Sequence, residues 1–253
     1  MSYTVAIAGK GGTGKTTVAA LVVARLIAAG RKPVLAVDAD PNSCLDSALG
    51  VNVTQTVGAV REEAREMAGK GLGAGVSKQE MLELKIHESL VESDSFDLIA
   101  MGRCEGPGCY CYANNVLSKV IERLADDYPT MVIDNEAGLE NLSRRIVRKV
   151  DLLMMVTDPS RVGLTTVERL HGLADEMGLK YDKLAIVINR LRNDALPEGA
   201  EALKEKTDAD VLVGLPADSI LAELGERGES LFNLQDGHPV LAAMDGLFAE
   251  VGR

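Results

Sequence analysis

The sequence lacks any long apolar run. None of its hydrophobic stretches approaches the about 20 residues that a membrane-spanning helix needs, so we expect no membrane segment. The N-terminal residues pass directly into an apolar stretch that reads as a strand, so we expect no signal peptide. Both absences favour a cytoplasmic protein, and thiols in that compartment stay reduced.

Basic residues are also scarce. Lys and Arg number 27 against 38 Asp and Glu, which gives a formal net charge of −11. A strongly acidic chain repels the phosphate backbone, so we expect no nucleic-acid partner. Tryptophan is absent, and 46% hydrophobic with 26% charged residues is the composition of an ordinary soluble globular protein.

Internal repeats, low-complexity tracts and interdomain linkers are missing too. A chain of 253 residues can bury a substantial core, and we expect residues 1–253 to form a single domain. Apolar runs alternate with helical patterns, the latter including 15–29 and 113–127, as a parallel sheet requires. The expected strands are 4–8, 33–38, 96–102, 130–134, 152–156, 184–189 and 210–215. The pattern predicts an α/β fold with a mostly parallel twisted sheet and helices on both faces.

One glycine-rich segment between an expected strand and an expected helix carries the clearest chemistry. It fits the pattern G-x-x-x-x-G-K-[ST], and its residues are Gly9, Lys10, Gly11, Gly12, Thr13, Gly14, Lys15, Thr16 and Thr17. Glycines let backbone amides surround a β-phosphate, and a helix N-terminus favours an anion. Lys15 is expected to reach the β- and γ-phosphates, and the Thr16 hydroxyl to bind Mg²⁺. The segment predicts a nucleoside triphosphate site.

Lys10 is one lysine more than this pattern requires. The run K-G-G-x-G-K-T-T, from Lys10 to Thr17, resembles the deviant Walker A ATPases, a class that includes MinD, ParA and the nitrogenase iron protein. The resemblance implies a P-loop ATPase that closes as a homodimer around ATP. It also implies that Lys10 crosses the interface to the partner's nucleotide and neutralises charge during phosphoryl transfer, as an arginine finger does.

Acidic residues end two of the expected strands, where open α/β sheets bind ligands. Asp134 matches a Walker B position, which holds Mg²⁺ directly or through water. By the resemblance, Asp40 orients the attacking water and Asp38 supports Mg²⁺, although the residues leave open which aspartate has which role. The resemblance makes Lys10, Lys15 and Asp40 the catalytic residues. Gly138 is expected to sense the γ-phosphate through its amide.

Recognition of the base is indicated further along the chain. Asn189 and Arg190 end an expected strand, and asparagine can pair bidentately with adenine. In the resembled class, an asparagine here and a Pro-x-Asp segment after the next strand hold adenine, which points to Pro216 and Asp218. The run from Asn189 reads N-R-L-R and lacks the guanine-reading N-K-x-D pattern, so ATP is favoured over GTP.

The sequence has four cysteines, which in a reducing compartment are metal ligands, reactive thiols or core residues before disulfides. Cys109 and Cys111 form a C-x-C pair in an expected loop bounded by glycine and proline. Two thiolates this close can bind one metal but cannot complete a four-coordinate site alone. Two copies about a two-fold axis supply four sulfurs, which suit Zn²⁺, Ni²⁺, Cu⁺ or an iron–sulfur cluster. The roles of Cys44 and Cys104 stay open.

The phosphate loop and the cysteine pair together resemble the CooC-type nickel-insertion ATPases, which mature carbon monoxide dehydrogenase. Related members serve acetyl-CoA synthase. The resemblance extends over essentially the whole chain and implies an ATP-hydrolysing dimeric metallochaperone. Its two pairs of Cys109 and Cys111 would bind one Ni²⁺ between the subunits, with Zn²⁺ possible at the same thiolates. Neither composition nor spacing distinguishes these metals or identifies the client enzyme.

Two other functions stay open. An iron–sulfur or electron-transfer ATPase like the nitrogenase iron protein also shares cysteines between subunits, but its cysteines are well separated in sequence. A positioning ATPase of the MinD or ParA kind is the second alternative. MinD-like proteins end in a basic amphipathic membrane helix, whereas residues 239–253 contain Arg253 as their only base.

Overall fold

The computed structural model describes most of the chain. The residues described are 2–42, 44–60, 62–63, 84–103, 109–139, 149–193 and 195–252, without the side chains of residues 109–116. Half of the charged stretch 54–95, which the sequence marks as an insertion between strands, lies outside them, including its glycine-rich part 69–75.

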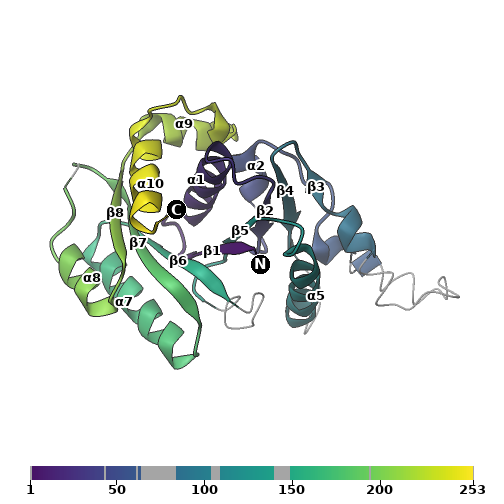
Figure 1. The fold of residues 1–253 in the computed structure, drawn as a ribbon, viewed down its shortest axis with the longest axis horizontal. Coiled ribbons are helices and arrows are strands. Elements are labelled where there is room, and N and C mark those ends of the chain that lie inside the picture. Colours follow the sequence, from purple (N-terminus) through teal and green to yellow (C-terminus); the bar gives the residue numbers. More distant parts are fainter. Residues whose placement is uncertain are drawn as a thin grey trace, which may run out of the picture.

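An eight-stranded sheet forms the centre of the protein, in the order β3-β4-β2-β5-β1-β6-β7-β8 (Figure 1). Every neighbouring pair is parallel except β3 and β4. The strands are β1 Tyr3–Gly9, β2 Val34–Asp38, β3 Val91–Glu92, β4 Phe96–Ala100, β5 Thr130–Asp134, β6 Val150–Thr157, β7 Tyr181–Leu191 and β8 Val211–Pro216. The predicted fold class is confirmed, and each of the seven predicted strands is present; only the two-residue edge strand β3 was not predicted.

Helices cover both faces of the sheet (Figure 1). They are α1 Lys15–Ala28, α2 Leu45–Leu49, α5 Cys109–Leu124, α7 Arg161–Glu176, α8 Ala200–Thr207, α9 Ser219–Arg227 and α10 Pro239–Glu250, with a 3₁₀ helix at Leu231–Asn233. One buried apolar cluster joins the sheet to α1, α2, α9 and α10, and a second joins it to α5, α7 and α8. Because both faces are covered, the central strands are apolar on both sides rather than alternating, as expected of a parallel sheet.

Helix α5 differs from its predicted range, 113–127. It begins four residues earlier, so Cys109 and Cys111 lie in its first turn and not in a loop before it. The helix-breaking residues Pro107 and Gly108 end just before it, and nothing in the following residues opposes a helical turn. Its buried face repeats at helical spacing through Leu117, Val120, Ile121 and Leu124.

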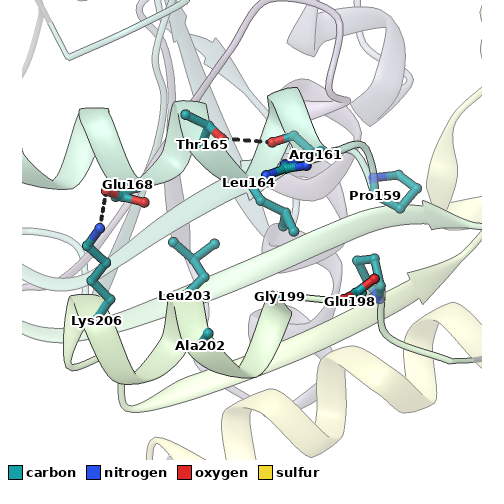
Figure 2. A pocket seen from close by; sticks show the side chains of 11 residues that line it. Pro159, Arg161, Leu164, Thr165, Glu168, Glu198, Gly199, Ala202, Leu203 and Lys206 are labelled. Carbon is teal, nitrogen blue, oxygen red and sulfur yellow. Dashed lines mark hydrogen bonds and ion pairs between the residues drawn. The ribbon is translucent and has the colours of Figure 1, made fainter.

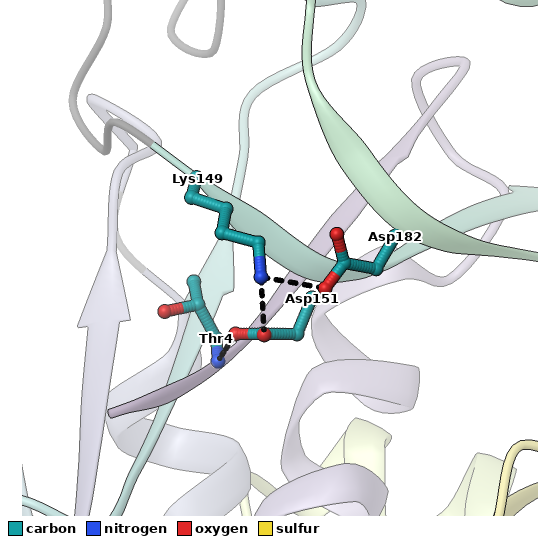
Figure 3. Close-up of polar contacts among 4 residues, drawn as sticks. All are labelled: Thr4, Lys149, Asp151 and Asp182. Carbon is teal, nitrogen blue, oxygen red and sulfur yellow. Dashed lines mark hydrogen bonds and ion pairs between the residues drawn. The ribbon is translucent and has the colours of Figure 1, made fainter. Parts of the chain in front are cut away.

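Polar contacts join the amino-terminal ends of β1, β6 and β7 (Figure 3). Asp151 accepts a hydrogen bond from the Thr4 amide at 2.8 Å, and the Lys149 ammonium lies 3.4 Å from Asp151 and 2.6 Å from Asp182. The Thr4 amide is thereby paired at the strand's start. The opposite, carboxyl edge of the sheet is where the predicted site residues lie.

Among the described residues, we find no helix with both the length and the apolar character needed to cross a membrane.

Packing of the sheet should dominate stability. Ile186 in β7 is 0% exposed, whereas Ile220 in α9 is 51% exposed. We expect Ile186→Ala to lower the free energy of unfolding by about 2–5 kcal/mol, because it leaves a cavity in the core. The matched variant Ile220→Ala should change it by no more than about 0.5 kcal/mol. Urea unfolding measures both, and equal losses would contradict this account of the core.

Candidate functional site

The glycine-rich segment joins the end of β1 to the start of α1, as predicted. A side chain at Gly9 would place its Cβ 2.2 Å from the carbonyl oxygen of Val156, so only glycine fits there. Gly12 and Gly14 have φ values of +80° and +91°, in the left-handed region that favours glycine. The strand, loop and helix context that the motif requires is therefore present.

The two lysines of the loop have different surroundings. Lys15 is buried, and its ammonium donates to the carbonyl oxygen of Lys10 at 3.3 Å. Lys10 itself is exposed. Hydrogen bonds from Ser160 lower the pKa of Asp158, and the nearby positive charges of Lys10 and Arg190 lower it further. Lys10 therefore has an acidic neighbour within its own chain.

Asp38 and Asp134 are register neighbours at the ends of β2 and β5, and both are buried. The Asp38 carboxylate accepts three backbone amides, from Asp40 at 3.1 Å, Cys44 at 2.9 Å and Leu45 at 3.0 Å. It therefore holds the loop between β2 and α2. Asp40 lies half-buried on that loop, and its carboxylate accepts from Asn42.

Burial changes the acidity of both buried carboxyls. Desolvation raises the pKa of Asp38 to about 6 and that of Asp134 to about 7. Hydrogen bonds to each carboxylate lower its pKa, but by less than desolvation raises it. Thr16 bonds the Asp134 carboxylate, whose buried Oδ1 has no partner within the described part of the chain. A cation would relieve this cost.

These donors fit Mg²⁺, which prefers one or two carboxylates and completes its shell with phosphate oxygens and water. The described residues hold no cluster of three or more His, Cys, Asp or Glu suited to a metal ion. A site of Thr16 with Asp38 and Asp134 therefore suits an ion that arrives with a nucleotide better than one held by protein alone.

The segment after Asp134 is tied to β1 and to the glycine-rich loop. The Asn135 side-chain amide donates to the carbonyl oxygen of Ile7 at 2.9 Å. The Gly138 amide donates to the carbonyl oxygen of Gly9 at 3.1 Å, with φ at +100°. The amide predicted to sense a γ-phosphate therefore lies directly beside the first residue of the phosphate loop.

Asn189 and Arg190 hold the phosphate loop from β7, a role that sequence reasoning missed. The Asn189 side chain donates to the carbonyl oxygen of Thr13 at 2.9 Å and accepts from the Arg190 amide at 2.9 Å. The Arg190 guanidinium donates to the carbonyl oxygen of Gly12 at 3.1 Å, from a backbone with φ at +62°. Both ends of the Asn189 amide are engaged, and its contact with adenine stays a prediction.

The Pro-x-Asp segment follows β8, as predicted. Pro216 ends the strand, and Asp218 caps α9 by accepting from the Leu221 amide at 2.9 Å. Asp218 also lies 3.4 Å from His238. The capping role was detectable in the sequence, since an aspartate directly before a helical pattern is a common N-cap.

The cysteines are only partly described. Cys44 is exposed in front of α2. Cys104 lies outside the described residues, as do the side chains of Cys109 and Cys111 in the first turn of α5. The intersubunit thiolate site stays a prediction.

A groove of about 620 Å³ lies between α7 and α8 (Figure 2). Leu164 and Leu203 face one another across it, and Lys206 pairs with Glu168 between the two helices. None of the predicted site residues lines this groove. It is therefore separate from the nucleotide site.

The raised carboxyl pKa values give a pH dependence. Each carboxyl keeps its proton to a higher pH in the folded than in the unfolded chain, where its pKa is about 4. The folded protein thus binds more protons through this range, and stability falls as pH rises towards 6 for Asp38 and 7 for Asp134.

Without Mg²⁺ or nucleotide, we expect Asp134→Asn to raise the melting temperature at pH 8 and to leave it nearly unchanged at pH 4. The exposed Asp236→Asn is the matched control. Thermal scans across this pH range test the account, and a melting temperature lowered by Asp134→Asn at pH 8 would refute it.

Comparison with known proteins places the chain in a family. Residues 4–232 match the CobQ/CobB/MinD/ParA nucleotide binding domain model. An uncharacterized ATP-binding protein of Methanocaldococcus jannaschii is 38% identical, over 98% of this chain and 97% of that protein. The carbon monoxide dehydrogenase accessory protein CooC of Rhodospirillum rubrum is 28% identical, over 95% of each chain.

Among solved structures, the septum site-determining protein MinD of Pyrococcus horikoshii, complexed with Mg-ADP, superposes with a TM-score of 0.70. It is 24% identical, over 99% of this chain and 94% of that one, and so shows the likeness of fold. The family match extends from β1 into the 3₁₀ helix and includes the phosphate loop and every strand. The chain therefore belongs to the CobQ/CobB/MinD/ParA nucleotide-binding family and is an ATPase.

Proposed function

We propose that this ATPase is a homodimeric metallochaperone that binds Ni²⁺ between two copies of its Cys109 and Cys111 pair. It delivers the metal to carbon monoxide dehydrogenase or to the related acetyl-CoA synthase. Ni²⁺ is the cargo of this reaction, and Zn²⁺ can occupy the same soft thiolates.

The observation that carries the proposal is the position of the cysteine pair in the fold. Strands β2 and β4 are parallel neighbours, and Asp38 is in register with Ala100. The chain therefore leaves β4 at the same sheet edge as the nucleotide site. Helix α5, which begins at Cys109, is the next described element. A pair so placed can respond to events at the nucleotide.

The similarity to CooC of Rhodospirillum rubrum adds support, since it extends over 95% of each chain. By its name, that protein is an accessory of carbon monoxide dehydrogenase. The C-x-C pair supplies two of four thiolates, and Lys10 acts across an interface. Both features require a second subunit, and the homodimer supplies it.

The proposed roles in hydrolysis fall to residues of the phosphate loop and of the strand ends beside it. Thr16, Asp38 and Asp134 would hold Mg²⁺, which supplies charge neutralisation at the phosphates. Lys15, which is buried in the loop, would contact those phosphates, and Asp40 would orient the attacking water. Lys10 leaves its own chain's acidic neighbour for the partner's nucleotide.

The remaining proposed contacts hold the nucleotide in place. Gly138 contacts the γ-phosphate through its amide. Asn189 and Arg190, with Pro216 and Asp218, border the adenine. Closure is driven by the tighter binding of ATP than of ADP to the closed dimer.

Helix α10 has no free apolar face for a membrane surface. Helix α10 buries Val240, Leu241, Met244, Leu247 and Phe248 against the core. An amphipathic membrane helix needs a free apolar face and a basic one. This apolar face is already covered by the protein itself.

The trans role of Lys10 predicts a separation of binding from dimerisation. Lys10→Ala should still bind ATP, because Lys15 and the loop amides are intact, but should not dimerise when ATP is added. Light scattering with and without ATP measures this, with the exposed Lys180→Ala as the matched control. Dimerisation of Lys10→Ala at the parent level would remove the trans role.

The shared thiolate site predicts one Ni²⁺ per dimer. Cys109→Ser and Cys111→Ser should each lose most of this binding in equilibrium dialysis, because the site then keeps only two of four sulfurs. Cys44→Ser, which changes an exposed cysteine outside the pair, should bind as the parent does. Parent-like binding by both pair variants would refute the site.

Delivery is tested separately from binding. Nickel-loaded parent protein with ATP should activate apo carbon monoxide dehydrogenase, whereas nickel-loaded protein without ATP should not.

A brown chromophore in anaerobically purified protein would instead favour the alternative function, an ATPase that carries an iron–sulfur cluster.

A further inference from the structure

The loop between β2 and α2 is fixed at its base by Asp38 and at its tip by Asn42. The backbone amide and the side chain of this tip residue make three hydrogen bonds, and its carbonyl oxygen accepts a fourth from the Cys44 thiol at 3.8 Å. Its backbone amide and its side-chain amide both donate to Asp40 Oδ1, at 2.8 Å and 3.1 Å. Its side-chain oxygen accepts from the guanidinium of Arg103 at 2.7 Å. One asparagine side chain therefore connects Asp40 to Arg103.

The oxygen and the nitrogen of the Asn42 side-chain amide have different hydrogen-bond partners. A guanidinium can only donate, so the Asn42 oxygen has to face Arg103 and the Asn42 nitrogen has to face Asp40. Both side-chain links are charge-assisted, one through the guanidinium donor and the other through the carboxylate acceptor, and the bond from Arg103 is the shorter, at 2.7 Å against 3.1 Å. Arg103 thus sets the orientation of Asn42, and Asn42 in turn sets that of the Asp40 carboxylate.

The backbone just before Arg103 is held in place by its contacts. The Met101 amide donates to the carbonyl oxygen of Asp38 at 2.8 Å. Gly102 has φ at +63°, and a Cβ there would lie 2.3 Å from the Thr56 side chain. The end of β4 is therefore held against the end of β2, and Arg103 is the first residue beyond this anchor.

We propose that Arg103 and Asn42 form a positioning relay, which orients Asp40 for ATP hydrolysis and links it to the connection between β4 and α5. The orienting step rests on described side chains and on the proposed role of Asp40 at the attacking water. The link to metal rests on the proposed function, because α5 begins with Cys109 of the thiolate pair. Metal binding by the dimer then changes the position of Arg103, and through it the orientation of Asp40 and of the attacking water.

Steady-state hydrolysis of ATP tests the orienting step. Arg103→Met should lower kcat about fivefold to tenfold with KM changed by less than about twofold, because the relay acts on the attacking water and not on ATP binding. Arg103→Lys keeps a cationic donor and should recover most of kcat. Arg227→Met, at an exposed arginine of α9, is the matched control.

Asn42→Asp separates orientation from simple loop stability. It keeps the acceptor for Arg103 but loses the side-chain donor to Asp40 and places a like charge beside it. We expect kcat to fall at least as far as in Arg103→Met, with an unchanged melting temperature. A parent-like kcat in Asn42→Asp or in Arg103→Met overturns the relay, as does Arg103→Lys no more active than Arg103→Met.

Added NiCl₂ tests the link to metal. We expect Ni²⁺ to change the kcat of the parent and to leave that of Arg103→Met unchanged, although both bind Ni²⁺ equally. An equal response in both, or a parent that binds Ni²⁺ without any change in kcat, overturns the link. If the parent binds no Ni²⁺, the proposed function and the link both fail, while the orienting step is still decided by the metal-free kcat values.

Discussion

The buried carboxylate of Asp38 is the interaction on which the nucleotide site depends. It accepts three backbone amides of the following loop, and its own carbonyl oxygen accepts the amide of Met101 at the end of β4. The same residue therefore fixes the start of α2, the loop between β2 and α2, and the end of β4. Any rearrangement there has to move these three parts together.

This arrangement has a cost in electrostatics. Asp38 and Asp134 are neighbours in a low-dielectric environment, and burial raises the pKa of both. A site built only for stability would replace one of them by an apolar or amide side chain. In the proposed function, a cation bound together with phosphates would offset this cost.

Local sequence patterns predicted much of the fold and of the site's frame. The apolar runs located every long strand, and the lysine- and glycine-rich motif located the strand, loop and helix around Gly9–Thr17. Those features depend on neighbouring residues alone. The start of α5 was wrong because residues after Gly108 extend the helix without a distinct N-terminal signal.

Contacts between distant segments could not be predicted in this way. The bonds from Asn189 to Thr13 and from Arg190 to Gly12 join residues about 176 and 178 positions apart. The bond from Arg103 to Asn42 spans 61 positions. Only the strand order brings these residues together, and a single sequence does not give the order in which strands align.

Because the Gly138 amide already donates to the carbonyl oxygen of Gly9, its proposed contact with a γ-phosphate would be a competition between two acceptors. In its proposed role, the amide gives up a neutral carbonyl oxygen for a charged phosphate oxygen. A charge-assisted bond is roughly twice as strong as a neutral one, so the net gain is about the strength of one neutral hydrogen bond. Such a small difference lets the carbonyl recapture the amide as soon as the γ-phosphate is lost. The segment can then return to its starting position with no separate force to drive it.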